Sequence, residues 1–223
     1  FVQGECVITN ARTAEMAKLT ENSCRDVQIA FANELSIICD KLDIDVWELI
    51  SLANRHPRIN ILQPGPGVGG HCIAVDPWFI VSKTPSEAQL IHTARKVNDA
   101  KPQWVINKVK LAIADFLQAN PTKSAKDVTI ACYGLAFKAN IDDLRESPAL
   151  LISSEIAAFH KGKTLVVEPN IAELSKKVCN AELVSLDKAK VCEAIHVFLV
   201  EHVQFKNIGK LDGRILDFKG IWC

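Results

Sequence analysis

The chain has 223 residues, of which 48% are hydrophobic and 23% charged, and its formal net charge is 0. This balance is typical of a folded chain of one or two domains, and it gives no electrostatic reason to expect a nucleic-acid or membrane partner. Apolar runs stay far below the ~20 residues that span a bilayer, and the first residues show no signal-peptide pattern. The eight cysteines do not have the spacing of metal ligands. We expect a cytoplasmic chain without a bound metal and, because it does not begin with methionine, a portion of a longer protein.

A first long helix is predicted from Thr13, as its N-cap, to about Asp40. One face carries an apolar stripe at helical spacing, made of Cys24, Val27, Phe31, Leu35, Ile38 and Leu42. The opposite face is mixed, with Lys18, Asn22, Ile29, Arg25 and Asn33. Lys18 and Asn22 are neighbours on that face and can donate to one oxygen, although two solvated surface side chains are the commoner arrangement.

A shorter second helix is predicted from its N-cap Asp45, with Glu48 in the first turn, and ends before Pro57. Basic residues cluster at the end of this helix, where Arg55, His56 and Arg58 follow one another closely. These side chains either cap the last carbonyls of the helix or reach an anionic ligand.

The segment 64–78 contains four glycines and two prolines before Cys72, and Asp76 follows four residues later. Such a loop can present N–H groups to a developing negative charge, which indicates a nucleophilic cysteine with a carboxylate that handles water or a proton. The alternative is a tight turn followed by a buried cysteine in a short strand, 72–75. A cysteine hydrolase using Cys72 and His71 is disfavoured, because adjacent residues rarely present their side chains to each other.

Two further helices are predicted after this loop. The segment 84–87 combines a capping box with proline at the first helical position, and its helix runs to about Asn98. Pro102 opens another helix that continues to Leu117. The polar segment 123–126 then indicates a linker, so we predict one domain over residues 1–122 and a second over residues 123–223.

The second domain alternates strands with helices, a rhythm that predicts a parallel sheet covered on both faces. The expected strands are 127–133, 164–167, 183–185, 196–200 and 214–218, with helices from Ser147 to about 162, from Asn170, and over 187–194. Ligands of such sheets bind outside the carboxyl ends of the strands.

The loop after the first of these strands, 134–147, carries one glycine and therefore lacks the dinucleotide-binding fingerprint. It contains Lys138 and Arg145, either of which can hold a phosphate. For Arg145 an ion pair with Asp142 or Asp143 that fixes the loop is an equally good interpretation.

Four motifs in order resemble the UDP-glucose/GDP-mannose dehydrogenase family over essentially the whole chain. They are residues 14–22, 67–72, 134–138 with 142–148, and 217–220. Val68, His71, Asp76-Pro77 and the segment 54–61 resemble the branch of the family that acts on N-acetylhexosamines. The resemblance implies an α/β architecture: an all-helical central dimerisation domain followed by a Rossmann-like parallel α/β domain that binds a UDP-sugar.

The resemblance implies an NAD-dependent, four-electron oxidation of a primary alcohol to a carboxylate, with UDP-N-acetylmannosamine as the expected substrate. Cys72 would be the nucleophile that forms a thiohemiacetal and then a thioester. Lys18 and Asn22 would stabilise the oxyanion, and Asp76 would position the water that releases the acid.

The same resemblance assigns the binding residues. Substrate contacts would come from Arg58, Asn60, Gly69, Gly70, His71, Phe137, Lys138 and Lys219, and a cofactor contact from Arg145. Arg58 would reach the sugar nucleotide of the other subunit in a homodimer formed through the long helix. The NAD-binding domain of the family is absent from this sequence, so we expect the chain alone to be inactive. The alternative function is a non-catalytic dimerisation and nucleotide-sugar-binding module.

Overall fold

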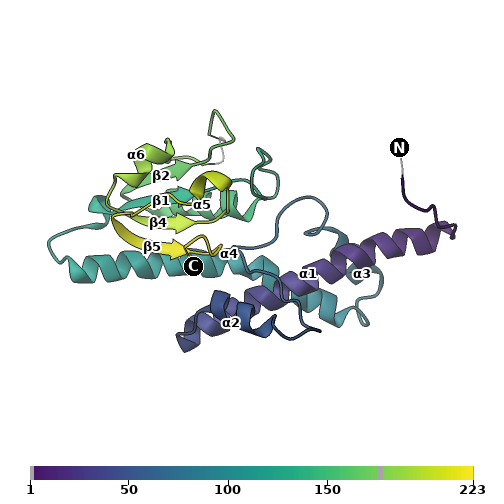
Figure 1. Ribbon diagram of the computed structural model, residues 1–223. Coiled ribbons are helices and arrows are strands. Elements are labelled where there is room, and N and C mark those ends of the chain that lie inside the picture. The colour runs from purple at the N-terminus through teal and green to yellow at the C-terminus, as the bar shows by residue number, and fades with distance from the viewer. Residues whose placement is uncertain (1–2, 175–177, 223) are drawn as a thin grey trace.

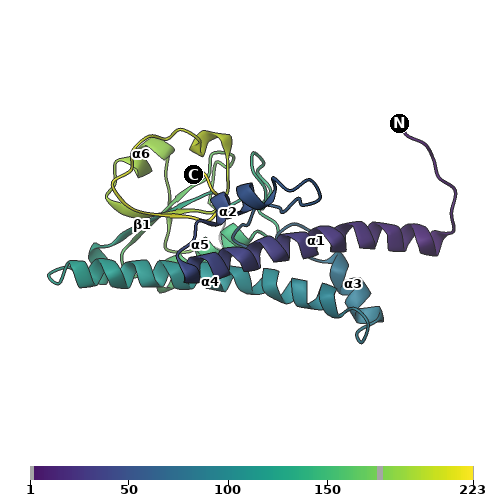
Figure 2. The ribbon, with the colours of Figure 1, turned by 60° about the horizontal axis from the view of Figure 1, so that its bottom comes forward.

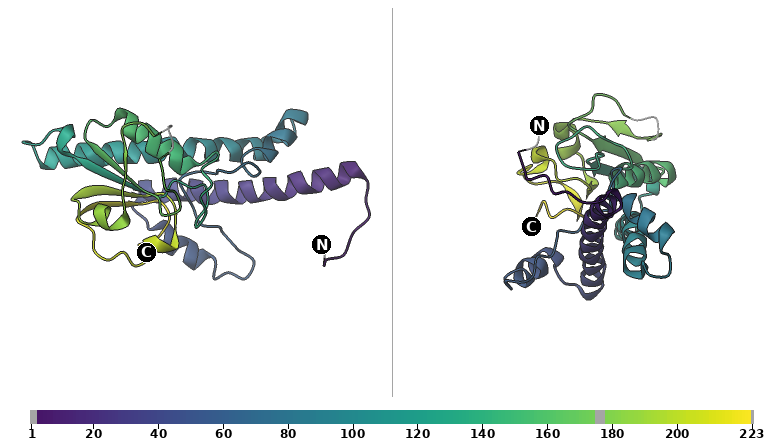
Figure 3. Two further views of the ribbon diagram at one scale, coloured as in Figure 1. Left: turned by 90° about the horizontal axis from the view of Figure 1, so that it is seen from above. Right: turned by 90° about the vertical axis from the view of Figure 1, so that its right-hand side faces the viewer.

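The computed structural model describes residues 3–174 and 178–222, and it has a helical part and an α/β part (Figure 1). The helical part contains α1 (Ala11–Leu42), α2 (Val46–Ala53), α3 (Asp76–Lys83) and the first half of α4 (Gln89–Ala119). The two long helices α1 and α4 lie side by side (Figures 2 and 3). The two helices are parallel: residue numbers increase together in the pairs that join them, from Asp26 with Arg95 to Asp40 with Lys108.

The N-terminus of α1 lies earlier than the sequence predicts. Asn10, and not Thr13, is the N-cap, and its side-chain oxygen accepts a hydrogen bond of 2.9 Å from the backbone N–H of Thr13. Both residue types cap helices well, so the sequence alone does not choose between them. The prediction for α2 is confirmed at its start, where the carboxylate of Asp45 accepts from two first-turn N–H groups.

The apolar stripe of α1 is not the face that packs within this chain. Phe31, Ile38 and Leu42 are 51%, 46% and 60% exposed. The buried face is the small and polar one that includes Asp26, Ala30 and Asn33, and it lies against α4. About half of the surface of these three side chains is therefore left uncovered by the described residues of this chain, whereas Val27 and Leu35 of the same stripe are half-buried.

A buried polar seam joins α1 to α4. It consists of Asp26, Asn33 and Ser36 on α1 and Arg95, Asn98 and Lys101 on α4. Arg95 donates to Asp26 at 2.6 Å, and Asn98 donates to the same carboxylate at 2.8 Å. Burial raises the pKa of the Asp26 carboxyl, although Arg95 and Asn98 both oppose this shift. The seam fixes the register of the two helices, since each buried polar group depends on a partner across the interface.

The two helices predicted over 84–98 and 102–117 form one helix. The segment 84–87 forms a turn before α4, and Pro102 lies inside α4. Pro102 removes one backbone hydrogen bond, but continuing the helix buries Val105, Ile106 and Val109 in the core of the α/β part. No helix of the described residues, α4 included, is both long and apolar enough to cross a membrane.

Five described strands form one parallel sheet in the order β3-β2-β1-β4-β5. They are β1 (Thr129–Tyr133), β2 (Lys163–Val167), β3 (Glu182–Leu183), β4 (Ala194–Phe198) and β5 (Gly213–Asp217). One face is covered by α5 (Pro148–Phe159) and the second half of α4, and the other by α6 (Leu186–Lys190) and residues 205–211. Short 3-10 helices span Ala125–Asp127 and Val203–Phe205. The predicted parallel sheet covered on both faces is confirmed.

The expected strands and helices of this part are present except for one helix, but some of their bounds differ. The helix expected over 187–194 ends at Lys190, the strand expected over 196–200 is β4 and begins at Ala194, and the strand expected over 183–185 is limited to β3. Ser147 caps α5 as expected, with Pro148 at its first position. The helix expected from Asn170 is not present at 170–174 or 178–180, where the chain forms turns and bends, and residues 175–177 lie outside the described part. Asn170 instead bonds back to the carboxylate of Glu168.

Candidate functional site

Cys72 is exposed and lies in a turn that leads directly into α3. Its carbonyl oxygen accepts hydrogen bonds from the N–H groups of Val75 and Asp76, at 3.0 and 2.8 Å. The alternative of a buried cysteine in a short strand is therefore wrong, because the turn points the chain back towards α3 and leaves the thiol accessible to solvent.

Asp76 and Asn22 join α3 to α1. The side-chain N–H of Asn22 donates to the carboxylate of Asp76 at 2.5 Å, although the two residues are 54 positions apart in the sequence. Lys18 lies one turn earlier on α1 and forms an exposed ion pair with Glu21 at 3.1 Å. The structure thus brings Asn22 to the segment that carries Cys72, whereas Lys18 pairs with a residue of its own helix.

The glycine loop packs closely against the α/β part. A Cβ atom at Gly69 would lie 2.6 Å from the carbonyl oxygen of Glu146 and 2.6 Å from Pro148. Gly70 has a φ of 82°, and a Cβ atom at this position would lie 3.1 Å from the ring of Phe137. Only glycine permits this approach, so these residues hold the thiol-bearing loop against the loop that follows β1.

A basic pocket of about 300 Å³ lies where these elements meet. Its cationic lining residues are Arg25 from α1, Lys138 from the loop after β1, and Lys219 after β5. Phe137, Gly65–Gly67 and the residues 199–201 after β4 complete its walls. The pocket is at the carboxyl ends of β1 and β4, where the strand order reverses and where ligands of open parallel sheets bind.

Arg25 is a pocket residue to which the sequence interpretation assigned no role. It follows Asn22 by three positions and therefore shares a face of α1 with it, which is the signal that could have found it. Lys219 is only 19% exposed in its side chain and pairs with Glu201 at 3.5 Å. The pocket therefore holds three cations and one nearby carboxylate, an arrangement suited to a ligand with more than one negative charge.

Arg145 forms the ion pair that was one of its two interpretations. It donates to Asp143 through its backbone N–H, its Nε and its Nη2, the last at 2.6 Å. These hydrogen bonds lower the pKa of Asp143 to about 2. The guanidinium group is exposed, so the pair shapes the end of the loop without removing Arg145 from solvent.

Arg58 and Asn60 do not reach the basic pocket of their own chain. The side chain of Asn54 bonds both the N–H and the carbonyl of Ile61, at 2.7 and 3.0 Å, and so closes the loop between them. Arg58 and Asn60 are exposed within this closed loop. His71 is also exposed, and its position beside Asp143 contributes to the low pKa of that carboxyl.

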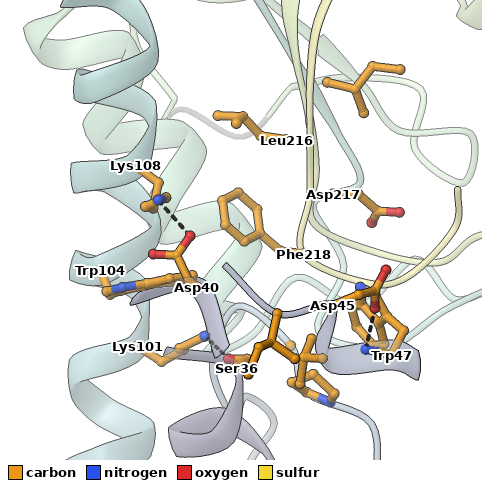
Figure 4. A pocket seen from close by; sticks show the side chains of 15 residues that line it. Ser36, Asp40, Asp45, Trp47, Lys101, Trp104, Lys108, Leu216, Asp217 and Phe218 are labelled. Carbon is orange, nitrogen blue, oxygen red and sulfur yellow. Dashed lines mark hydrogen bonds and ion pairs between the residues drawn. The ribbon is translucent and has the colours of Figure 1, made fainter. Parts of the chain in front are cut away.

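A second cavity of about 280 Å³ lies between α1, α2, α4 and the end of β5 (Figure 4). Lys101 is 1% exposed, donates to the hydroxyl of Ser36, and lies 3.8 Å from the ring centre of Trp104. Lys108 pairs with Asp40 at 2.6 Å in the same cavity. Burial lowers the pKa of Lys101 to about 7, with the charge of Asp40 opposing the shift.

The low pKa of Lys101 predicts a specific dependence of stability on pH. Between pH 7 and about 10.4 the unfolded chain holds a proton on this amine that the folded chain has released, so folding becomes more favourable as pH rises. Relative to Lys101→Met, the wild-type free energy of unfolding should increase by up to about 1.4 kcal/mol per pH unit across this window. Urea unfolding of both forms at several pH values measures the difference, with Lys96→Met on the exposed side of α4 as control; parallel curves would contradict the prediction.

Two family models match this chain, each over one of its parts. The central domain of the UDP-glucose/GDP-mannose dehydrogenase family matches residues 12–100, and the UDP binding domain of the same family matches residues 131–222. The chain belongs to the UDP-glucose/GDP-mannose dehydrogenase family.

Individual relatives specify the similarity further. Over the whole chain it is 62% identical to UDP-N-acetyl-D-mannosamine dehydrogenase of Escherichia coli (strain K12), covering 54% of that protein. It is 55% identical to NDP-N-acetyl-D-galactosaminuronic acid dehydrogenase of Ralstonia solanacearum, covering 51% of it. The resemblance drawn from the motifs, to the family and to its branch that acts on N-acetylhexosamines, is confirmed at this level.

Solved structures agree with the sequence relatives. The UDP-N-acetyl-mannosamine dehydrogenase from S. aureus superimposes with a TM-score of 0.79 at 41% identity, over 99% of this chain and 51% of that one. A UDP-D-ManNAc dehydrogenase from Pyrococcus horikoshii gives a TM-score of 0.81 at 34% identity, with 99% and 51% covered. The chain spans about half the length of the relatives it matches.

Proposed function

We propose that this chain supplies the thiol and the UDP-sugar site of an NAD-dependent 6-dehydrogenase that oxidises UDP-N-acetylmannosamine to its uronic acid. The observation that carries the proposal is the packing of the Cys72 loop directly onto the loop that holds Lys138. Gly69 and Gly70 lie close to Phe137, the residue before Lys138 and part of the pocket wall, which supports a single site formed by the thiol and the basic pocket.

The basic pocket would hold the UDP portion. Arg25, Lys138 and Lys219 together offset the charge of a diphosphate, and the guanidinium of Arg25 can bind two of its oxygens at once. Phe137 gives the pocket an apolar wall beside the glycine loop. Held at this end, the sugar would extend along α1 towards Asn22 and Cys72.

Cys72 would act on the C6 aldehyde of the bound sugar. Its thiolate adds to the carbonyl carbon and gives a thiohemiacetal, whose oxidation leaves a thioester on the sulfur. Asn22 and Lys18 would donate to the oxyanion on C6, and Asp76, held by Asn22, would orient the water that cleaves the thioester to the acid and regenerates the thiol.

NAD would accept the two hydrides, and we assign its binding mainly to a domain outside this chain. The described sheet does not fit a dinucleotide well, because the loop after β1 has one glycine and its first N–H groups already donate to Glu168. Arg145 is the one contact that this chain would contribute, from its exposed position on the loop.

The uncovered face of α1 supports the homodimer. Phe31, Ile38 and Leu42 form an exposed apolar stripe on α1, and a second copy of the chain would cover it. In such a dimer the closed loop that carries Arg58 and Asn60 would be free to reach the basic pocket of the partner, which is consistent with their distance from the pocket of their own chain.

Binding of UDP tests the proposal on the chain itself. Millimolar UDP should raise the unfolding temperature, and Lys138→Ala should remove the shift because one charge-assisted contact to the diphosphate is lost. Thermal unfolding with and without UDP measures both effects. Lys161→Ala is the matched control, since Lys161 precedes β2 and so lies at the amino ends of the strands, whereas the pocket lies at their carboxyl ends.

The second candidate function is a non-catalytic dimerisation and nucleotide-sugar-binding module, favoured by the exposed stripe of α1. Sedimentation distinguishes the possibilities when combined with the UDP experiment. A dimer that gains no thermal stability from UDP would leave only the dimerisation role, whereas a UDP shift lost in Lys138→Ala supports the substrate site.

A further inference from the structure

Two buried residues hold the loop after β1 from the side that faces β2. Glu168 directly follows β2 and is 4% exposed, and His202, four residues after β4, is 0% exposed. Neither residue lines the basic pocket, yet both contact the segment 134–140 that carries Lys138. A buried carboxylate and a buried imidazole are costly unless their hydrogen bonds are satisfied, so their contacts explain why they are there.

The Glu168 carboxylate accepts hydrogen bonds only. Its Oε2 accepts from the backbone N–H groups of Leu135 and Ala136, at 2.7 and 3.1 Å, and from Nε2 of His202 at 3.0 Å. Its Oε1 accepts from the backbone and side-chain N–H groups of Asn170, both at 3.1 Å. Burial by itself raises the pKa of Glu168, but these hydrogen bonds outweigh it and hold the pKa below its ordinary value.

His202 carries the same network to the far end of the loop. Its Nδ1 accepts from the backbone N–H of Asn140 at 2.9 Å, which assigns the proton to Nε2, the atom that donates to Glu168. Asn140 has a left-handed φ of 61°, and its side-chain oxygen accepts from the N–H of Val203 at 2.9 Å. Both ends of the segment 134–140 are therefore pinned to one buried pair.

The carboxylate of Glu168 occupies the position at which the loop after β1 could otherwise bind an anionic ligand. Successive N–H groups after a parallel strand form a typical anion site, and an acid after the second strand binds ribose in dinucleotide-binding sheets. Here the acid itself occupies the anion position. The space is also closed at Gly134, where a Cβ atom would lie 2.4 Å from the side chain of Val200.

We propose that Glu168 and His202 are positioning residues that fix the 134–140 loop with Lys138 projecting into the basic pocket, and that they close the β2 side of the sheet to a dinucleotide. The proposal rests on the proposed function of the basic pocket. It adds that the affinity for a nucleoside diphosphate depends on a buried pair that does not touch the ligand.

Glu168→Gln tests the pair with little change in shape. Glutamine replaces one carboxylate oxygen with an NH2 group. Because every partner at this site is a donor, that NH2 group would face donors and find no acceptor. We expect the amide hydrogens of Leu135 and Ala136 to exchange at least about tenfold faster, and UDP to bind at least about tenfold more weakly by calorimetry. Glu155→Gln, an exposed glutamate of α5, is the matched control and should change neither quantity.

A double-mutant cycle separates positioning from a general effect on folding. If Glu168 acts through Lys138, Glu168→Gln should weaken UDP binding little further in the Lys138→Ala background. Additive losses, or unchanged exchange of Leu135 and Ala136, would overturn the inference. Should Glu168→Gln not fold, His202→Gln tests the outer contact with Asn140 by the same two measurements. Hydrogen exchange needs no ligand, so it tests separately whether the buried pair holds the loop. A wild type that does not bind UDP would instead count against the proposed function.

Discussion

Cys72→Ser should abolish formation of the uronic acid when this chain is joined to an NAD-binding domain. A serine hydroxyl in place of the exposed thiol is a far weaker nucleophile towards the aldehyde and gives no thioester, so the rate of acid formation should fall at least about a thousandfold. NADH formation with UDP-N-acetylmannosamine, UDP-N-acetylglucosamine and UDP-glucose is the measurement, and the first of these should be the best substrate of the unaltered enzyme.

Cys24→Ser is the matched control for this substitution. Cys24 is also an exposed free cysteine and lies on α1, within one turn of Asn22, so the variant changes a nearby thiol without changing the proposed nucleophile. Its activity should equal that of the wild type. Retained acid formation in Cys72→Ser, or an equal loss in Cys24→Ser, would show that the chemistry does not depend on the thiol of residue 72.

Arg95→Met should produce the largest loss of stability among substitutions outside the site. It leaves the carboxylate of Asp26 buried without its cationic partner, and breaking a buried pair in this way costs about 3–5 kcal/mol. Urea unfolding at pH 7 measures the loss. The deficit should shrink as pH falls towards about 4, because protonation of Asp26 removes the uncompensated charge, whose cost develops only above the unfolded pKa of about 3.9.

Arg214→Met is the control for Arg95→Met. Arg214 forms an equally short ion pair with Asp115, at 2.6 Å, but both side chains are about half exposed. Removing it should change the free energy of unfolding by no more than about 1 kcal/mol, because exposed pairs are solvated and screened. Equal effects of the two substitutions would mean that the seam does not hold α1 to α4.

Local sequence signals were enough for much of the α/β part. Apolar runs such as Ile130–Tyr133 and Leu165–Val167 lie in the strands, and Ser147 caps α5. In the helical part, Asp45 likewise caps α2. These features depend on neighbouring residues only, so the sequence carries them. The choice of Thr13 over Asn10 failed for the opposite reason, because two equally good caps stand three residues apart.

Features set by distant contacts could not be predicted. Pro102 locally favours a helix start, but the core of the α/β part binds the second half of α4 and keeps the helix continuous. Asp26 and Arg95 are 69 positions apart, and nothing local pairs them. The motif residues of the site were found by family resemblance, and the prediction of the roles of Cys72, Lys18 and Asp76, like the domain division at 122 and 123, stays a prediction.

The continuity of α4 has a consequence for the proposed substrate site. One end of this rod fixes α1, which carries Asn22, while the other end is embedded beneath the sheet that carries Lys138 (Figures 1 and 2). In the proposed site, the distance between the diphosphate in the basic pocket and the carbon that reacts with Cys72 would therefore be fixed by a continuous helix and not by a hinge. A sugar nucleotide with one phosphate more or fewer would reach its anchor and still present the wrong carbon to the sulfur.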